Sequence, residues 1–305
     1  MAANGAENKS ASMDEVLQEG LEQATRRRRR RWLIVLIVAL VVFVGALVAL
    51  GVLAYSYVQG QQKYDEIAQK AELDTTQITE EVQLDTLTID WDALLKANPD
   101  TVGWIYMPDT PINYPVVQGK DNEHYLYYDF DGDAGWLAEY GAIFLDYRNK
   151  KTFADPSNYI YGHHMNDGSM FAIISSFEDS AAFNAHRVAY LLTPQGNYRL
   201  RSFSIVHCDA YDPIVETVFA SRKDMAKYVQ DKMDRSLVKV DDVPKATEMR
   251  QIFALATCDS YSAGRDVLFM YVLDTTAKGL EGEIGLGGDD DSTWFVDDLE
   301  AKGQG

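Results

Sequence analysis

The stretch QIFALATCDSYSAGRDVLFMYVLD, residues 251–274, decides the fold, because it holds two apolar runs on either side of a short polar segment. Runs of this length, bounded by turn residues, are typical of buried strands. Cys258, one of two cysteines in the chain, ends the first run, and Arg265 follows Gly264 into the second. Such a cysteine is either a small buried apolar side chain or a nucleophile whose thiolate a nearby cation supports.

Six segments upstream have the same character. They are short, apolar or alternating, and bounded by turn residues, and they cover residues 101–108, 111–118, 140–147, 158–164, 187–193 and 197–211. Eight strands in one domain favour a closed barrel, because closure leaves no exposed sheet edge. Helices are predicted from Asp90, over residues 169–177 and over residues 221–237. The predicted fold is therefore mainly β, a closed eight-stranded barrel with peripheral helices.

A long uncharged segment precedes this domain. Residues 32–55 carry no charge, and a helix of that length crosses the hydrocarbon core of a bilayer. Six arginines, residues 26–31, come immediately before it, so the positive-inside rule places the N-terminus in the cytoplasm and the following domain outside. A cleavable signal peptide would have a shorter apolar region. We therefore predict a single-pass signal anchor in the cell membrane.

The anchor divides the chain into parts of different character. We expect a cytoplasmic tail at residues 1–31, a transmembrane anchor at 32–57 and an extracellular spacer at 58–88. A catalytic domain at 89–278 and an acidic tail at 279–305 follow. The formal net charge is −19 despite the arginine block, so the exported part is strongly acidic. An acidic surface repels nucleic acid, and we expect no nucleic-acid partner. Because the exterior is oxidising, a disulfide between Cys208 and Cys258 stays open as an alternative.

A cysteine nucleophile needs a proton carrier with a pKa near neutrality, and histidine supplies one. His163 and His164 lie in NYIYGHHMNDGSMF, residues 158–171, where a predicted strand gives way to a loop. His124, His186 and His207 are alternatives. The last of these precedes Cys208 directly, and neighbours on a strand point to opposite faces, so the two form a poor dyad.

No metal or cofactor is predicted. The chain contains neither Cys-x-x-Cys nor His-Glu-x-x-His. The segment DFDGDAG, residues 129–135, alternates aspartates as a calcium loop does. Ala134 and Tyr140 stand where an EF-hand needs glycine and glutamate, so the segment is not an EF-hand.

Several segments together resemble class B sortases, the membrane-anchored cysteine transpeptidases of Gram-positive cell surfaces. The resemblance runs from about residue 90 to residue 276 and is carried by NPDTVGWIYMPDTPINYPVVQGKDNEHYL, GAIFLDYRN, NYIYGHHMNDGSMF and LATCDSYSAGR. It implies that Cys258 is the nucleophile and that His163, which follows a glycine directly, is the general acid and base. It also implies that Arg265 stabilises the oxyanion and the substrate.

The resemblance extends to weaker positions. The family pattern Thr-Leu-x-Thr-Cys reads ALATC here, with Ala254 in place of the first threonine. This departure affects a local hydrogen bond more than the nucleophile. Thr257 belongs to the same pattern, and Asn122 and Leu126 lie in a segment that lines the groove for the sorting signal in class B sortases. The resemblance therefore implies that these three residues contact the substrate.

The implied reaction is acyl transfer. The cysteine would cleave a C-terminal sorting signal of a surface protein after a threonine, giving a thioacyl-enzyme, and an amine of a peptidoglycan precursor would resolve it. A pilin-polymerising sortase differs only in using a pilin amine. Two further alternatives remain at this point: a hydrolytic cysteine peptidase, in which water resolves the thioester, and a non-catalytic wall-binding module with the Cys208–Cys258 disulfide.

Overall fold

The structure is a computed structural model, which describes residues 3–79, 81–134, 140–209, 212–258 and 264–277. The acidic tail predicted for residues 279–305 lies outside the described residues. The chain consists of two compact units, Met1–Ser56 and Tyr57–Gly305. Each unit is described by itself below.

The first unit consists of the earlier part of helix α1, which runs from Ala3 to Ala71. Its span Thr25–Ala71 is long and apolar enough to cross a membrane, and its most apolar window has no buried residues within the structure. Apolar side chains that find no protein partner require another apolar environment, and a helix satisfies its own backbone hydrogen bonds in lipid. This part of α1 is therefore a candidate membrane anchor.

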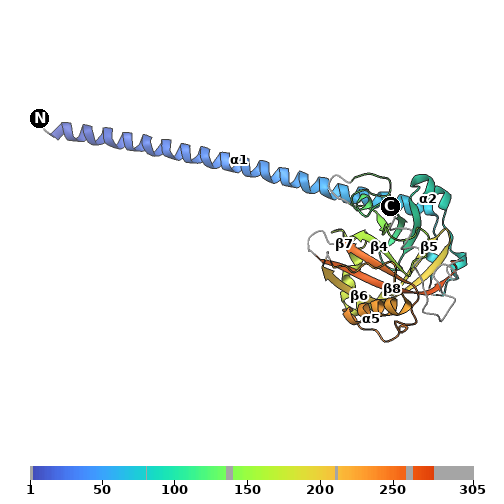
Figure 1. The fold of residues 1–305 in the computed structure, drawn as a ribbon. Coiled ribbons are helices and arrows are strands. Elements are labelled where there is room, and N and C mark those ends of the chain that lie inside the picture. The colour runs from blue at the N-terminus through green and yellow to red at the C-terminus, as the bar shows by residue number, and fades with distance from the viewer. Residues whose placement is uncertain (1–2, 80, 135–139, 210–211, 259–263, 278–305) are drawn as a thin grey trace. The chain divides into compact units, whose positions relative to one another are not determined.

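The second unit contains a closed barrel of eight strands (Figure 1). The strands are β1 Thr101–Tyr106, β2 Asn113–Val117, β3 Ile143–Leu145, β4 Ser157–His163, β5 Val188–Thr193, β6 Gly196–Asp209, β7 Ile252–Cys258 and β8 Gly264–Thr275. Their order around the barrel is β1-β2-β3-β4-β7-β8-β6-β5, and β5 pairs with β1 to close it. The predicted eight-stranded barrel is confirmed.

Two of the strand pairs are parallel, and one of them shapes the site. Strand β4 runs parallel to β7, whereas β7, β8 and β6 follow one another in antiparallel ladders. The long connection between β4 and β7 contains β5 and β6, which makes this crossover possible. Because β4 and β7 point the same way, their last residues, His163 and Cys258, meet at one end of the barrel.

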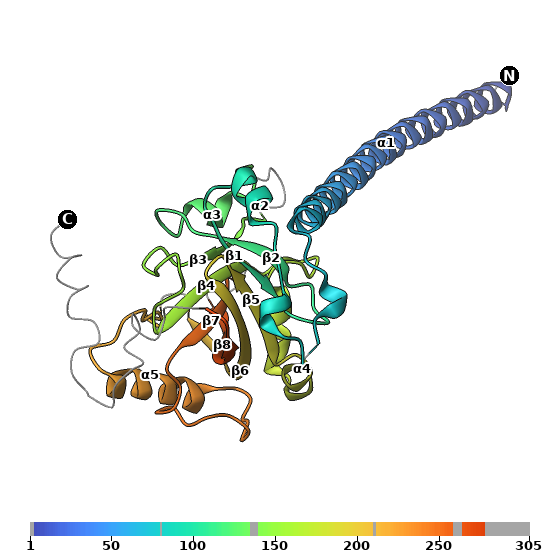
Figure 2. The same ribbon diagram turned by 90° about the vertical axis from the view of Figure 1, so that its right-hand side faces the viewer.

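Short helices surround the barrel (Figure 2). They are η1 Thr75–Gln77, η2 Leu84–Thr86, α2 Trp91–Ala97, α3 His124–Tyr127, η3 Ala172–Glu178, α4 Ser180–Ala185 and α5 Arg222–Arg235. Asp90 and Ser221 cap α2 and α5 by accepting hydrogen bonds from backbone N–H groups, as their sequences predict. The helix predicted over 169–177 begins later and is a 3-10 helix. The positive φ of Met170 breaks the start of that segment, and Asp179, directly after η3, caps the start of α4.

The core explains why the closing strands read as continuous apolar runs. Every residue of β7 from Ile252 to Thr257 is buried. One face of the strand lines the barrel interior, where Phe253 packs against Tyr198. The other face is covered from outside, where Tyr228 of α5 packs near Phe269 of β8. A strand buried on both faces shows no alternation in its sequence.

Candidate active site

The backbone register brings the three predicted catalytic residues to adjacent strands. His163 of β4 is the Cα partner of Cys258 in the parallel ladder with β7. Ala256 of β7 is the Cα partner of Val267 of β8 in an antiparallel ladder. Cys258 lies two residues after Ala256, and Arg265 lies two residues before Val267, so continuing the ladder sets Arg265 beside Cys258. Residues two apart on a strand share a face. The three positions therefore lie side by side on one face, at the same end of β4, β7 and β8.

His163 is held in a closely packed environment. The residue is 8% exposed, and its ring Nε2 lies 2.6 Å from the backbone oxygen of Leu126. A carbonyl oxygen can only accept, so Nε2 carries the proton and Nδ1 is the nitrogen that remains to exchange one. The ring also lies against Gly141, where an added Cβ would be 2.8 Å from the His163 Cδ2 atom. Gly141 has φ +54°, so glycine suits this position for both reasons.

The second histidine of the pair belongs to a different network. The His164 Nδ1 atom lies 3.0 Å from Ser175 Oγ, which donates a 2.5 Å hydrogen bond to Asp266 Oδ2. The other carboxylate oxygen, Oδ1, lies 2.7 Å from His207 Nδ1, and Glu178 lies 3.8 Å from the same nitrogen. Since both oxygens of Asp266 are engaged, this group links η3, β6 and β8 by hydrogen bonds. His164 and Asp266 directly follow the candidate residues His163 and Arg265 on β4 and β8. This hydrogen-bonded group therefore lies on the opposite face of the strands and stabilises them from that side.

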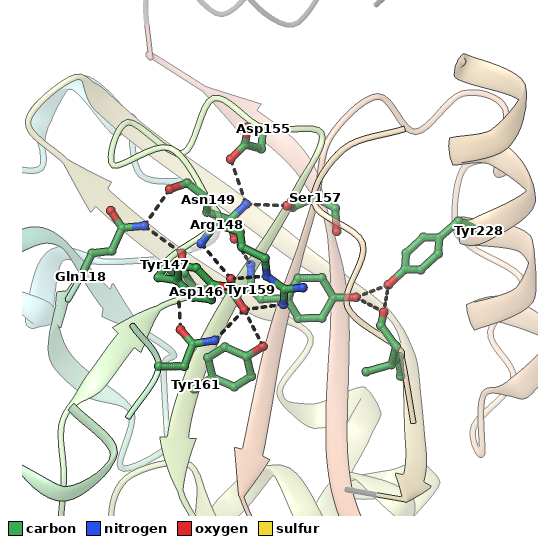
Figure 3. Close-up of polar contacts among 12 residues, drawn as sticks. Gln118, Asp146, Tyr147, Arg148, Asn149, Asp155, Ser157, Tyr159, Tyr161 and Tyr228 are labelled. Carbon is green, nitrogen blue, oxygen red and sulfur yellow. Dashed lines mark hydrogen bonds and ion pairs between the residues drawn. The ribbon is translucent and has the colours of Figure 1, made fainter. Parts of the chain in front are cut away.

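A buried carboxylate lies further along the face that carries the three candidate residues (Figure 3). Asp146 is fully buried and accepts hydrogen bonds from Arg148 Nε and Nη2 at 2.8 Å each, from Asn122 at 2.9 Å and from the Tyr161 hydroxyl at 2.9 Å. Burial opposes ionisation of this carboxyl, but the hydrogen bonds from Arg148 hold its pKa below the usual value. Tyr161 lies two residues before His163 on β4, so the network supports the same face.

This network was not predicted from the sequence. The segment GAIFLDYRN contributed only to the resemblance, although an Asp-x-Arg pair at the end of an apolar strand indicates a buried ion pair. Its partners come from residues 122 and 161, and only the fold brings them together.

Comparisons with known proteins agree with this geometry. No family model matches the chain. Sortase B of Listeria monocytogenes is 36% identical over 178 residues, which cover 57% of this chain and 70% of that protein. The chain belongs to the sortase B family. Sortases are cysteine transpeptidases, so this sortase is one as well.

Solved structures of other members resemble this sortase. Sortase B of Bacillus anthracis in complex with AAEK1 matches with a TM-score of 0.61 and 33% identity, over 72% of this chain and 98% of that one. A sortase B–substrate complex from Staphylococcus aureus matches with a TM-score of 0.61 and 27% identity, over 72% of this chain and 99% of that one. The predicted class B sortase barrel is thus confirmed by independent structures.

The three predicted substrate contacts of this sortase occupy different environments. Asn122 is half-buried, and its side-chain oxygen accepts a 3.0 Å hydrogen bond from the backbone N–H of Tyr147, while its amide binds Asp146. Leu126 is half-buried and supplies the carbonyl that holds His163. Thr257 is fully buried and precedes Cys258, so its side chain lies on the opposite face of β7. Asn122 and Leu126 thus hold neighbouring groups of the site, and the contact of all three residues with substrate stays a prediction.

The second cysteine of this sortase is a free, buried thiol. Cys208 of β6 is the Cα partner of Arg265 on β8. Burial raises the pKa of the Cys208 thiol, and the positive charge of Arg265 acts against that shift. Strand β8 separates β6 from β7, and two strand spacings of about 4.8 Å exceed the roughly 7 Å limit between Cα atoms for a disulfide. The alternative with a Cys208–Cys258 disulfide does not fit this arrangement.

The aspartate-rich loop of this sortase holds a lysine. Lys63 of α1 places its Nζ atom 2.6 Å from Asp129, 3.3 Å from Asp131 and 2.7 Å from Asp133. Burial favours the neutral amine, but hydrogen bonds and charge from the aspartates outweigh it and raise the pKa of Lys63. Within the described residues, an ammonium group thus occupies the centre of the loop that resembles a calcium site.

Proposed function

We propose that this sortase cleaves a C-terminal sorting signal after a threonine and transfers the acyl group to an amine of the cell envelope. The observation that carries the proposal is the register of the barrel. It pairs His163 with Cys258 on neighbouring strands and sets Arg265 on the next strand at the same level. The structural match to the S. aureus sortase B–substrate complex supports the assignment of a sorting-signal peptide as the substrate here.

The first half of the reaction forms a thioester. The Cys258 thiolate attacks the threonine carbonyl carbon, and the oxyanion that develops is stabilised by the guanidinium of Arg265. The peptide C–N bond then breaks. The leaving amine takes a proton from Nδ1 of the His163 imidazolium, because Nε2 keeps its own proton, which it donates in a hydrogen bond to the Leu126 carbonyl.

The second half transfers the acyl group. An amine of a peptidoglycan precursor attacks the thioester carbonyl, and Nδ1 of His163 accepts the proton that the amine loses. The C–S bond breaks, and the thiolate of Cys258 is restored as the new amide forms. No cofactor takes part in this proposed cycle. A pilin amine in the same position would make the enzyme a pilin-polymerising sortase, and water would make it a peptidase.

The anchor determines where this reaction occurs. We infer that α1 spans the membrane once, with the arginine block of residues 26–31 in the cytoplasm and residues from Tyr57 onward outside. The catalytic domain would then act where exported sorting signals and envelope amines meet. Residues 58–88 and 89–278 remain our proposed division into a juxtamembrane segment and a catalytic domain.

The test uses the full-length enzyme in lipid nanodiscs with a library of peptides that contain candidate sorting signals. Mass spectrometry should detect a thioester on Cys258 and, after addition of candidate amines, a new amide at the threonine. Cys258→Ala should abolish both products, while Cys208→Ala should keep substantial activity. A folded Cys208→Ala enzyme without activity would contradict the assignment of the nucleophile. Hydrolysis that no amine diverts would favour the peptidase.

The two histidines give a matched comparison. His163→Ala should lose roughly 100-fold in kcat, the usual size of a general acid–base contribution. His164→Ala should lose far less, because its ring binds Ser175 on the opposite face. Equal losses in two folded variants would remove the support for choosing His163.

A further inference from the structure

We propose that Tyr64, on the segment of α1 that follows the membrane anchor, is a positioning residue for His163. The inference rests on the proposed function, because it assumes that His163 is the acid and base. Tyr64 makes no contact with the reacting atoms in this proposal. It acts by fixing the backbone against which the histidine ring packs.

The relevant segment of α1 presents one face to the catalytic unit. Tyr57, Gly60, Tyr64, Ile67 and Ala71 follow one another at helical spacing and are half-buried or buried. The surrounding positions of the helix are mostly exposed. The predicted spacer is therefore packed onto the catalytic unit over this stretch, and its inward face contains two aromatic side chains.

Tyr64 makes the decisive contact on this face. Its side chain is 5% exposed, and its hydroxyl donates a 2.7 Å hydrogen bond to the backbone oxygen of Gly141. The ring packs edge-on against Tyr114 of β2, with 5.3 Å between centroids. Burial raises the pKa of Tyr64, so the phenol stays protonated and keeps donating at physiological pH.

Gly141 passes this constraint to the histidine. An added Cβ at Gly141 would lie 2.8 Å from the His163 ring and equally close to the backbone oxygen of Leu126, the same atom that binds His163 Nε2. The next residue, Ala142, donates a 2.9 Å hydrogen bond to the backbone oxygen of Tyr125. The backbone of residues 140–142 is thus packed between the α1 segment and the 125–126 segment, and both segments set the place of the ring.

Further contacts hold the α1 segment to the same region. The Tyr140 hydroxyl lies 2.9 Å from the backbone oxygen of Tyr57 and donates a 2.7 Å hydrogen bond to Asp167. An added Cβ at Gly60 would collide with the Tyr140 ring, so the helix approaches this ring closely. Lys63 joins the aspartate loop on the neighbouring side of the helix. The helix is therefore fixed on both sides of Tyr64, which gives its hydroxyl a defined position.

The experiment compares two buried tyrosines in the full-length enzyme in nanodiscs. Tyr64→Phe removes only the hydroxyl that binds Gly141. Tyr190→Phe is the matched control, because the Tyr190 hydroxyl donates a 2.8 Å hydrogen bond to the backbone oxygen of Thr79. Both hydroxyls thus tie the chain before the barrel to the catalytic unit, but only one leads to His163. Steady-state kinetics with a cleaved peptide and NMR signals of the His163 ring are the readouts.

We expect Tyr64→Phe to lower kcat roughly tenfold, as small misplacements of catalytic groups do, with KM within about twofold. The His163 ring signals should shift in this variant and stay unchanged in Tyr190→Phe, while both variants lose similar thermal stability. Equal kcat values and unshifted ring signals in the two variants would overturn the inference. If Tyr64→Phe does not fold, Tyr140→Phe, which removes the hydroxyl that contacts the same helix at Tyr57, decides between the same two results.

The same measurements separate this inference from the proposed function. His163→Ala serves both to assign the NMR signals and to test the acid–base role. If His163→Ala keeps normal turnover, the proposed function fails whatever Tyr64 does. If His163→Ala is inactive and Tyr64→Phe behaves like Tyr190→Phe, only the positioning role of Tyr64 fails.

Discussion

Among single residues, Gly141 combines a left-handed backbone with close contact to the side chain of His163, the candidate acid and base, and Gly132 shares only the first property. Gly141 has φ +54° and no room for a Cβ beside the His163 ring. Gly132 has φ +82° and open space around its Cα. The two glycines therefore separate the cost of backbone strain from the cost of displacing the histidine.

Substituting alanine at each glycine tests this separation. Both variants should lose about 1 kcal/mol of unfolding free energy from the strained backbone, and Gly141→Ala should lose more because of its contacts. Only Gly141→Ala should lose kcat, by roughly 100-fold, because the histidine must move. Chemical denaturation and peptide cleavage assays measure the two effects. An active Gly141→Ala enzyme would show that the ring tolerates a different position.

The ionised side chain of Asp146 should make the stability of the fold depend on pH. Its pKa is lowered in the folded state, so the ionised group stabilises the fold above its unfolded pKa of about 4, and this stabilisation is lost as the pH falls toward the folded pKa. Asp146→Asn should cost roughly 2 kcal/mol at pH 7, a moderate value because Arg148 is partly exposed.

Unfolding free energies of wild type and Asp146→Asn, measured from pH 7 to pH 3, should converge below about pH 4. A difference that stays constant over this range would mean that the charge of Asp146 contributes nothing and that only the shape of its side chain matters.

At the scale of elements, the register of β6, β8 and β7 sets Arg265 between the strands that carry the two cysteines. Burial raises the pKa of Cys208, and the positive charge of Arg265 partly opposes this rise. Arg265→Lys keeps this charge but replaces a planar fork of donors by a single ammonium.

We expect Arg265→Lys to lose most of the transpeptidation rate, and Arg265→Met to lose at least as much. Initial rates with a cleaved peptide, together with circular dichroism as a check of folding, provide the measurement. Near-normal turnover of Arg265→Lys would reduce the role of this residue to that of a positive charge.

The elements also show what the sequence can predict. The eight strands follow from short apolar runs between turns, and the caps of α2 and α5 follow from Asp90 and Ser221. The parallel pairing of β4 with β7 could not be predicted from local patterns, because it depends on contacts between residues far apart in the chain. The packing of α1 against Tyr140 was missed for the same reason, since polar composition made residues 58–88 resemble a solvated spacer.

For the candidate site, the resemblance predicted Cys258, His163 and Arg265, and the register places their backbones together. Residue types alone left five histidines to choose from. The support around them, such as the Leu126 carbonyl and the Tyr64 hydroxyl, consists of backbone contacts and long-range hydrogen bonds that leave no pattern in the sequence.

At the scale of the whole molecule, the candidate anchor predicts which side of the membrane each part of the chain occupies, and this can be measured. With the arginine block inside, protease added to intact protoplasts should digest the chain from about residue 60 onward and spare the N-terminal tail. Tags at the two ends, detected by immunoblotting, distinguish the fragments. A catalytic domain that survives protease on intact protoplasts, but not after lysis, would contradict the surface reaction.

The closure of the barrel has a consequence for how a peptide is recognised. Each of the eight described strands has a partner on either side, and β5 against β1 completes the ring. Many proteins bind an extended peptide by letting it join a sheet as one more strand, so that main-chain hydrogen bonds supply much of the affinity. A closed ring offers no vacancy of that kind. For the proposed sorting signal we therefore expect recognition to depend on side chains rather than on strand pairing, so a change of a single such residue can alter which signal is accepted while the ring itself stays the same.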